Sequence, residues 1–351
     1  MRIAIARLLP AALTAAFLAG CSASGPSKAP GAFPAVNPGG TPHAQYVVVG
    51  DDGNDSLLTY NLGTGSTIVA GNLAPAYDNH SATLKGPFFI FNDFNSNLWA
   101  ANFYNASLTW YSVSGTGATP TAHTISGSNT TLGNPTGVYI SANGTIYVAD
   151  RDSTRGYATV DEFAPGSSGN VAPVAWIGGP STTLSGVQGL SIDSSGNLWV
   201  INFGTLGVDE FSSSLSAGQN NVAPTAAITS TALGEPVEMY IDRQSHIWVG
   251  DLSAAVTGLP ALFEFNANGG AQTPICTISG SNTGLDAAGG QTSVAVDNGG
   301  YVYAVNNASP IIDIFAKGQC GNVTPAYTIS GAATGLSAPA GVVVYSTSND
   351  Y

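Results

Sequence analysis

Six positions in this sequence carry an oxygen-bearing side chain at the end of the same short apolar motif. They are Asp51, Asn102, Asp150, Asn202, Asp251 and Asn306. Hard cations bind through carboxylate and amide oxygens, so Asp150 and Asn202 are candidate metal ligands. The competing interpretation is that these short side chains hydrogen-bond nearby backbone and stabilise a turn in every copy of the motif. We favour the turn interpretation and keep the metal site as the alternative.

Five further charged side chains are candidates for ligand contact. Asp78 and His80 lie in the segment APAYDNHSA, and Arg151 and Asp152 directly follow a candidate metal ligand. Glu238 begins an apolar run at a position where the other copies have Phe89, Gly137, Gly189, Ser293 and Gly341. A buried acid is costly unless it is paired or solvated, so Glu238 is the best single candidate for a ligand contact or a metal ligand. A hydrogen-bonded structural glutamate is the alternative.

Recognisable catalytic motifs are absent from the sequence. It contains no Gly-x-Ser-x-Gly elbow, no His-Glu-x-x-His motif and no phosphate-binding loop. We therefore predict no catalytic residues, although a hydrolase whose two acids come from different repeats stays open. We expect no cofactor, with a divalent cation, calcium or zinc, as the alternative.

Charge is scarce along the chain. Its 351 residues include 8 Lys and Arg and 21 Asp and Glu, which gives a net charge of −13 and a charged fraction of 8%. Nucleic-acid binding needs clustered cations, so that class of partner is excluded. The 14 Tyr, 13 Phe and 5 Trp argue against a disordered chain, and the 44 glycines suit frequent turns. The composition indicates an all-β protein.

An internal repeat shows which elements must position the candidate residues. An apolar run, a polar turn and an aromatic run recur about every 50 residues, as in VYISANGTIYVAD, LSIDSSGNLWVIN and MYIDRQSHIWVGD. Two more short runs follow each copy, so each unit predicts four strands. The first unit lacks its first strand, which GVVVYS near the C-terminus can supply. We predict a six-bladed β-propeller with four-stranded blades, closed by a C-terminal strand that completes the N-terminal blade.

The run PTGVYI, which begins at Pro135, and the following NGTIYVAD, which ends at Asp150, resemble the units of NHL-repeat six-bladed propellers. The resemblance extends over about residues 45–346 and is specific for the fold. It implies little about function, because propellers include binding proteins, hydrolases and lyases. Glu235-Pro-Val-Glu238 is only faintly similar to the Glu-Gly-Pro start of gluconolactonase-like propellers. No inner-strand histidine matches the catalytic histidine of streptogramin-lyase propellers.

The fold sorts its connections onto two faces. Turns between first and second strands lie on one face, whereas loops between second and third strands and connections between blades lie on the other. The resemblance implies that ligands bind on this second face, at the channel mouth, which the starts of the innermost strands should line. Three connections there are longer than their counterparts, over residues 71–87, 150–163 and 251–265. Such insertions often carry function, and tolerated drift is the alternative.

The N-terminus predicts export and a lipid anchor. Two arginines, an apolar stretch too short to span a membrane and small residues before Cys21 resemble a bacterial lipobox. We predict a signal peptide at 1–20, a lipidated Cys21 with a flexible tether over 21–43, and a propeller domain over 44–351. The protein would reside in the bacterial cell envelope, anchored to the outer membrane or facing the periplasm.

Cys276 and Cys320 can pair as a disulfide in that oxidising compartment, or remain two separate core residues. We predict a monomeric, lipid-anchored binding scaffold whose partners are the membrane and an envelope protein or glycan. The alternative is an exported metal-dependent hydrolase or lyase of lactonase or streptogramin-lyase type. A purely structural envelope protein is the third hypothesis.

Overall fold

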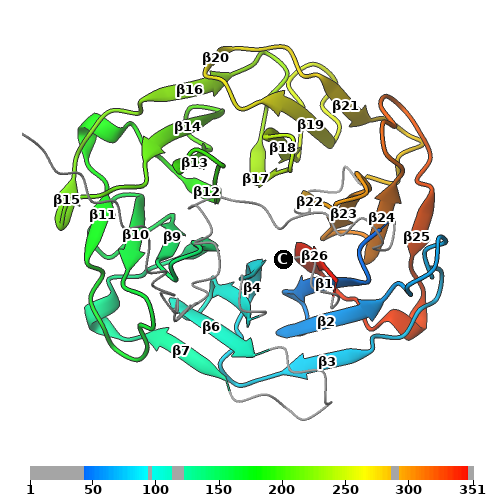
Figure 1. Ribbon diagram of the computed structural model, residues 1–351, viewed down its shortest axis with the longest axis horizontal. Helices are drawn as coiled ribbons and strands as arrows, with labels where there is room; N and C mark the ends of the chain where they lie inside the picture. The colour runs from blue at the N-terminus through cyan, green and yellow to red at the C-terminus, as the bar shows by residue number, and fades with distance from the viewer. Residues whose placement is uncertain (1–42, 94–96, 113–121, 286–291, 347–351) are drawn as a thin grey trace, which may run out of the picture.

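The computed structural model describes residues 43–93, 97–112, 122–285 and 292–346. They form six sheets arranged as blades around a central axis, so the protein is a six-bladed β-propeller (Figure 1). The predicted fold class is confirmed. Four antiparallel strands make each blade, and blades 3 and 4 each add one short parallel strand at the outer edge.

We number the blades from the N-terminus and their strands from the axis outward. The innermost strands of blades 1 to 6 are β26 (Pro339–Tyr345), β4 (Pro87–Asn92), β8 (Pro135–Ile140), β12 (Val187–Ile192), β17 (Pro236–Ile241) and β22 (Thr292–Val296). The second strands are β1 (Tyr46–Asp51), β5 (Asn97–Asn102), β9 (Ile146–Asp150), β13 (Asn197–Asn202), β18 (His246–Asp251) and β23 (Val302–Asn306). The third strands are β2 (Ser56–Asn61), β6 (Ser107–Ser112), β10 (Thr159–Phe163), β14 (Gly207–Ser212), β19 (Ala261–Asn266) and β24 (Ile311–Phe315).

The outermost strands are β3 (Tyr77–His80), β7 (His123–Ser126), β11 (Ala175–Ile177), β16 (Ala226–Thr229), β21 (Cys276–Ser279) and β25 (Tyr327–Ile329). The additional parallel strands are β15 (Gly218–Asn220) and β20 (Gly270–Ala271). Three short 3₁₀ turns follow outermost strands: η1 (Ser128–Thr130), η2 (Pro180–Thr182) and η3 (Ala332–Thr334). In the described part of the chain, no helix has the length and apolar character needed to cross a bilayer.

The ring closes by pairing the two ends of the chain, as predicted. β1 pairs with β2 on one side and with β26 on the other, where Val47 lies opposite Val344 and Val49 lies opposite Val342. This arrangement gives blade 1 a complete innermost strand and satisfies a strand edge that would otherwise be open.

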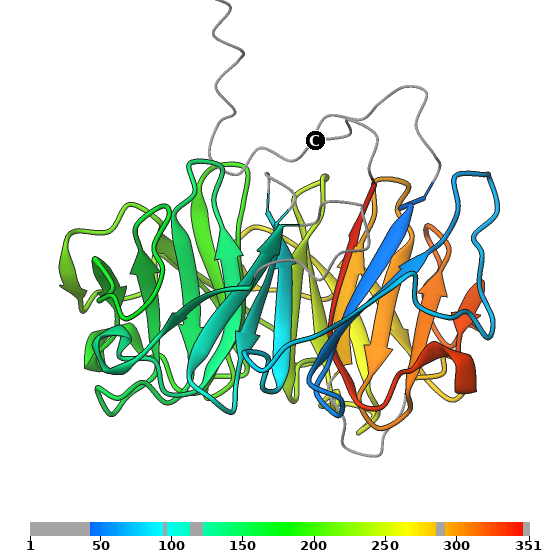
Figure 2. The ribbon, with the colours of Figure 1, turned by 90° about the horizontal axis from the view of Figure 1, so that it is seen from below.

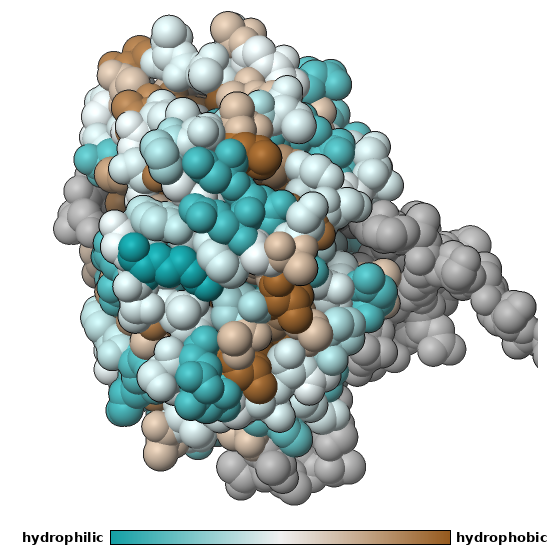
Figure 3. Space-filling model, turned by 90° about the vertical axis from the view of Figure 1, so that its left-hand side faces the viewer, coloured by the Kyte–Doolittle hydropathy of each residue, from teal (hydrophilic) through white to brown (hydrophobic). Residues whose placement is uncertain are grey.

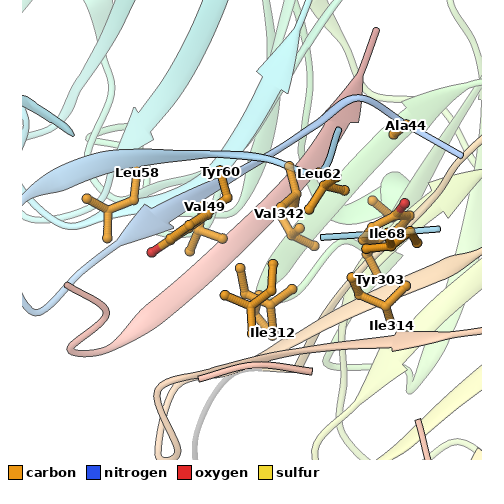
Figure 4. Close-up of a cluster of buried hydrophobic side chains, with 14 residues drawn as sticks. Ala44, Val49, Leu58, Tyr60, Leu62, Ile68, Tyr303, Ile312, Ile314 and Val342 are labelled. Atoms are coloured by element: carbon orange, nitrogen blue, oxygen red, sulfur yellow. The ribbon is translucent and has the colours of Figure 1, made fainter. Parts of the chain in front are cut away.

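The hydrophobic core is divided among the contacts between neighbouring blades. One cluster joins Val49 and Tyr60 of blade 1 to Tyr303 and Ile312 of blade 6 (Figure 4). Because each blade is covered on both faces by its neighbours, second strands such as β9 are buried at every position. This explains why these strands read as nearly continuous β-branched and aromatic runs in the sequence.

Asparagines near the outer rim hold neighbouring blades together. Each of them accepts a hydrogen bond at 2.7–2.8 Å from a backbone N–H that follows the outermost strand of the preceding blade; they are Asn72, Asn170, Asn221 and Asn322. A disulfide between Cys276 of blade 5 and Cys320 of blade 6 adds a covalent link at one of these contacts. The rim is therefore fastened by contacts that link one blade to the next.

The connections gather on two opposite faces because the strands stand across the thickness of the ring (Figure 2). We call the face with the turns between first and second strands the turn face. The opposite face, with the loops between second and third strands and the connections between blades, is the loop face. β1 begins on the turn face, since Tyr46 pairs with Tyr345 at the end of β26.

The outer wall shows apolar residues scattered among polar ones (Figure 3). Val174 and Val222, in connections of blades 3 and 4, are 44% and 49% exposed. Isolated exposed apolar residues are normal on soluble surfaces and do not mark a site.

Candidate functional site

The base of the loop face is the ring set, which we define as the six residues that end the second strands: Asp51, Asn102, Asp150, Asn202, Asp251 and Asn306. All six are buried, with at most 2% of their surface exposed. Aspartate occupies this position in blades 1, 3 and 5, and asparagine occupies it in blades 2, 4 and 6. The alternation has a cause in hydrogen bonding.

In the aspartate blades, both carboxylate oxygens accept backbone N–H groups from the connection into the innermost strand of the same blade. Asp150 accepts hydrogen bonds from Gly133 and Asn134 at 2.9 and 2.8 Å. Asp51 and Asp251 each accept two consecutive N–H groups of their own connections in the same way. Asparagine would offer only one acceptor here and would leave one N–H unpaired.

In the asparagine blades, the side chain both accepts and donates. The oxygen of Asn202 accepts the N–H of Ser185 at 3.0 Å, and its amide nitrogen donates to a carboxylate oxygen of Asp209 at 2.8 Å. Asn102 donates in the same way to the hydroxyl of Thr109 at 2.9 Å. A carboxylate has no proton to donate, so asparagine fits where the third strand presents an acceptor.

Blade 3 departs from this pattern because it has acids on both strands. Asp161 of β10 is fully buried, and its carboxylate accepts a hydrogen bond from Arg155 at 2.7 Å. The Arg155 guanidinium also lies 4.2 Å from the ring centre of Trp176. The long loop over residues 150–163 thus brings a cation to buried acids, which gives its extra length a structural reason.

These buried acids have pKa values near neutral pH. Burial raises the pKa of Asp150 to about 6, although the N–H groups of Gly133 and Asn134 lower it. Burial also raises the pKa of Asp161 to about 7, against the lowering effect of Arg155. Their protonation therefore couples to folding in the physiological pH range.

Glu238 contacts the next blade. Its carboxylate oxygen accepts the backbone N–H of Val294 in blade 6 at 3.1 Å, and the residue is 6% exposed. A Cβ placed on Gly189, the equivalent residue of blade 4, would lie 3.1 Å from the Cα of Glu238. We expected these positions to face the channel mouth, but such contacts show that they face the neighbouring inner strand. Burial raises the pKa of the Glu238 carboxyl well above its usual value.

The three candidate metal ligands lie in three different blades. Asp150 and Asn202 direct oxygens to backbone N–H groups, and Glu238 accepts one from blade 6. A metal at these residues stays a prediction.

Among the residues that the structure describes, one group of His, Cys, Asp and Glu side chains brings its ligand atoms within 4.8 Å of one another: Asp242, His246 and Glu264. It lies on the turn face, where Nδ1 of His246 lies 2.6 Å from a carboxylate oxygen of Glu264. Asp242 also accepts the indole N–H of Trp248 at 3.2 Å. These bonds give the group a structural role in the turn of blade 5.

Aromatic residues fill the loop-face end of the innermost strand of blade 2. Phe88 and Phe89, at the start of β4, are 8% and 3% exposed and pack with Ala340 of blade 1 and with Phe103. The rings of Phe88 and Phe103 stack with centroids 5.1 Å apart. An apolar cluster therefore occupies this position beside the axis.

Arg151 and Asp152 lie on the loop face beside this cluster. The Arg151 guanidinium lies 4.7 Å from the ring centre of Phe103, and its Nε lies 3.4 Å from a carboxylate oxygen of Asp152. The two side chains are 35% and 62% exposed. The structure thus places a predicted pair of ligand-contact residues next to aromatic side chains on the face where we expected them.

Asp78 and His80 lie elsewhere. We predicted a connection here, but residues 77–80 form β3, with His80 opposite Ser56 and Tyr77 opposite Thr59. Pairing with β2 satisfies the backbone of that strand, which outweighs the polar character of the segment. The two side chains form an exposed pair at 2.8 Å on the outer strand, away from Arg151 and Glu238.

The loop face also carries exposed apolar side chains. Of the nine large hydrophobic residues that are exposed in the described chain, five lie in loops between second and third strands: Tyr104, Phe203, Leu206, Val256 and Leu259. The other four, Val69, Val174, Val222 and Ile275, lie in connections between third and fourth strands, which reach the same side of the ring as the turns between first and second strands. The loops between second and third strands thus offer apolar contact area in blades 2, 4 and 5.

Comparisons with known proteins support the fold but assign no family or function. No protein-family model matches the chain, and no curated protein matches it. A chain of the nidogen/laminin complex is similar in structure, with a TM-score of 0.57 and 15% identity over 85% of this chain and 97% of that one. A Bacteroides caccae protein of unknown function gives a TM-score of 0.54 and 11% identity over 85% of this chain and 98% of that one. A Bacteroides fragilis protein with a provisional 6-phosphogluconolactonase designation gives a TM-score of 0.50 and 12% identity over 86% of this chain and 97% of that one.

Phe103 and Tyr104 are loop-face residues that we did not predict from the sequence. A signal was present, because the residue directly after the ring-set position varies among acidic, aromatic, basic, aliphatic and amide side chains: Asp52, Phe103, Arg151, Phe203, Leu252 and Asn307. Variation next to a structural position that is always Asp or Asn marks side chains that the fold does not require. Aligning the repeats on the ring set would have selected them.

Proposed function

We propose that this protein is a lipid-anchored β-propeller of the bacterial cell envelope that binds a partner through its loop face. The observation that carries the proposal is the contrast between the faces. The turns on one face use the same hydrogen bonds in most blades, whereas the loops on the other differ in length, charge and exposed apolar side chains. We also propose that the six units are NHL-like repeats, on the motif similarity described above.

The entry point of the chain supports a defined orientation. The backbone N–H of Ala44 donates to a carboxylate oxygen of Asp297 at 2.8 Å, in the turn of blade 6. The predicted tether therefore joins the propeller on the turn face. An anchor at Cys21 would hold that face toward the membrane and leave the loop face available to an envelope protein or glycan.

The lactonase- or lyase-like alternative has weaker support. It would need convergent ligands at the channel mouth, yet Glu238 contacts blade 6, and Asp150 and Asn202 bind backbone N–H groups. Phe88 and Phe89 pack beside the axis at the same end of the inner strands. A binding surface needs no such convergence.

Site-specific photo-cross-linking in cells tests the proposal. A benzophenone amino acid replaces Phe203 on the loop face or, as the matched control, Ser194 on the turn face. We expect cross-linked products at position 203 and none at position 194. Equal cross-linking at both positions, or none at position 203, would contradict a loop-face binding role.

The anchor has a separate test. Metabolic labelling with an alkyne fatty acid should label the wild type, and Cys21→Ser should abolish the label. An unlabelled wild type would remove the anchor from the proposal while leaving the loop-face test intact.

A further inference from the structure

A continuous strip of aromatic and planar polar side chains crosses the loop face from blade 1 to blade 3. We define this aromatic strip as Asp52, Phe88, Phe103, Tyr104, Arg151 and Asp152. They come from the loops that follow three ring-set residues and from the start of β4. The contacts within the strip join side chains of three blades that are far apart in the sequence.

Phe103 is the centre of the strip. Its ring stacks on Phe88 with centroids 5.1 Å apart and meets the ring of Tyr104 edge to face at 5.3 Å. The Arg151 guanidinium lies 4.7 Å from its centre. Aromatic and guanidinium groups at these separations attract one another, so the strip is ordered as a unit.

Tyr104 is exposed and yet held in place. The residue is 66% exposed. A Cβ on Gly86 would lie 2.4 Å from Cδ2 of Tyr104 and 2.7 Å from Cε2, so the ring rests directly against the glycine backbone. Its hydroxyl also donates to a carboxylate oxygen of Asp52 at 3.4 Å. A large exposed ring that is fixed by a backbone contact and a hydrogen bond is preorganised for contact with a ligand.

Donors and acceptors alternate beside these rings. Arg151 presents a planar array of N–H donors, and Asp152, 3.4 Å away and 62% exposed, presents acceptors. At the other end of the strip, the Tyr104 hydroxyl and the Asp52 carboxylate form a second donor and acceptor pair. Hydroxyl groups on adjacent carbons of a sugar both donate and accept, so they complement such pairs. The apolar C–H face of a pyranose ring complements an exposed aromatic ring.

We infer that the aromatic strip binds a neutral saccharide, with Tyr104 as the stacking platform and Arg151 and Asp152 as hydroxyl-binding groups. This inference rests on the proposed loop-face binding function and names its ligand class. Charge favours neutral over acidic saccharides, because the chain carries a net charge of −13 and the single cation of the strip lies beside Asp152. The exposed apolar residues of blades 4 and 5 lie outside the strip and offer no planar polar groups.

Binding to an oligosaccharide array tests the inference. The full-length protein, kept in a polyoxyethylene detergent that contains no sugar, is applied to neutral gluco-, manno-, galacto-, xylo- and N-acetylglucosamine oligosaccharides. Uronic-acid and sulfated oligosaccharides are included on the same array. We expect the protein to bind at least one neutral series. We expect it to bind no acidic oligosaccharide more strongly than that series.

Variants then localise the site by titration calorimetry with the bound oligosaccharide. Tyr104→Ala and Arg151→Ala should each weaken binding at least ten-fold, whereas Tyr104→Phe keeps the stacking surface and should lose less. Val174→Ala, at an exposed apolar residue outside the loop face, should bind as the wild type does. Thermal unfolding of each variant verifies that the fold is intact. We expect it to be intact in the Tyr104 variants because this side chain is exposed and lies outside the core.

Three results would overturn the inference: no neutral saccharide bound, preference for acidic saccharides, or undiminished binding by Tyr104→Ala. Cross-linking at position 203 distinguishes this failure from failure of the proposed function. Cross-links in cells without saccharide binding would leave a loop-face partner of another class, such as a protein. Absence of both would remove the two proposals together.

Discussion

The turn face and the loop face are made by the same six blades, yet the turns between first and second strands repeat their chemistry and the loops between second and third strands do not. On the turn face, an aspartate before the turn accepts two backbone N–H groups with one oxygen and an aromatic donor with the other. Asp193 does so with the N–H groups of Ser195 and Asn197 at 2.8 and 2.9 Å, and with the indole of Trp199 at 2.9 Å. The same arrangement recurs at Asp242 and, with a tyrosine hydroxyl as the aromatic donor, at Asp297.

The loop face repeats its buried base and, in four blades, a hydrogen bond from a Thr hydroxyl to a Gly carbonyl at the start of the connection to the next blade. Below the surface, the ring set fastens each connection to its blade, while the residues above it change from one blade to the next. Repetition in this chain therefore marks what the fold requires. Departure from repetition marks side chains that the fold leaves available for other roles.

The largest expected effect is on the turn face. Trp199→Ala removes an indole that is 1% exposed, together with its hydrogen bond to Asp193, so it should lower the free energy of unfolding by about 3–5 kcal/mol. Urea denaturation measures the change. Ser194→Ala in the same turn is the control and should stay within about 0.5 kcal/mol. A small effect of Trp199→Ala would break the argument that the repeated turn supports the fold.

A second prediction concerns the alternation in the ring set. Asn202→Asp replaces the amide donor with a carboxylate oxygen 2.8 Å from Asp209. It should lower the free energy of unfolding by about 2–4 kcal/mol at neutral pH. Adding Asp209→Asn restores a donor and an acceptor in exchanged positions and should recover most of the loss. If the double variant is as unstable as the single one, hydrogen-bond complementarity is not the cause of the alternation.

A third prediction is pH dependence from the base of the loop face. Burial raises the pKa of Asp150 and Asp313 to about 6 and that of Asp161 to about 7. Each carboxyl binds its proton more tightly in the folded than in the unfolded chain, so stability should fall as pH rises from about 4 to about 7. We expect each carboxyl to lower the free energy of unfolding by on the order of 1–3 kcal/mol between pH 5 and pH 8, as measured by urea denaturation at the two pH values.

Asp313→Asn supplies the control for this pH dependence. It removes one titrating carboxyl and should make the fall in stability with pH shallower. Stability that rises over the same range would contradict the assignment of protons to these buried acids.

The smallest expected effect on stability is at the exposed loops. Val256 is 79% exposed and Phe203 is 37% exposed. Val256→Ala should change the free energy of unfolding by less than about 0.5 kcal/mol, and Phe203→Ala by less than about 1 kcal/mol. Larger losses would show that these loops support the fold and would weaken the contrast between the faces.

Local sequence was sufficient for the blades. Alternating β-branched and aromatic residues, turn residues at regular intervals and a displaced first strand predicted six four-stranded units and their closure through β26. These features are local because strand and turn preferences depend on neighbouring residues, and the repeat makes each unit support the others. The four-residue strand β3 was missed because its polar sequence forms a strand only when β2 pairs with it.

The order of residues alone specifies the number of blades, the place of the ring set and the low charge of the chain. What each candidate residue contacts depends on how the blades pack. Glu238 meets a backbone N–H 56 residues away in blade 6, and Asn202 needs its amide because Asp209 lies beside it. Arg151, Phe103 and Tyr104 become one surface only when blades 2 and 3 are side by side. Hydrogen bonds and ring contacts act over a few ångströms, so ring closure, and not the order of residues, sets which groups meet.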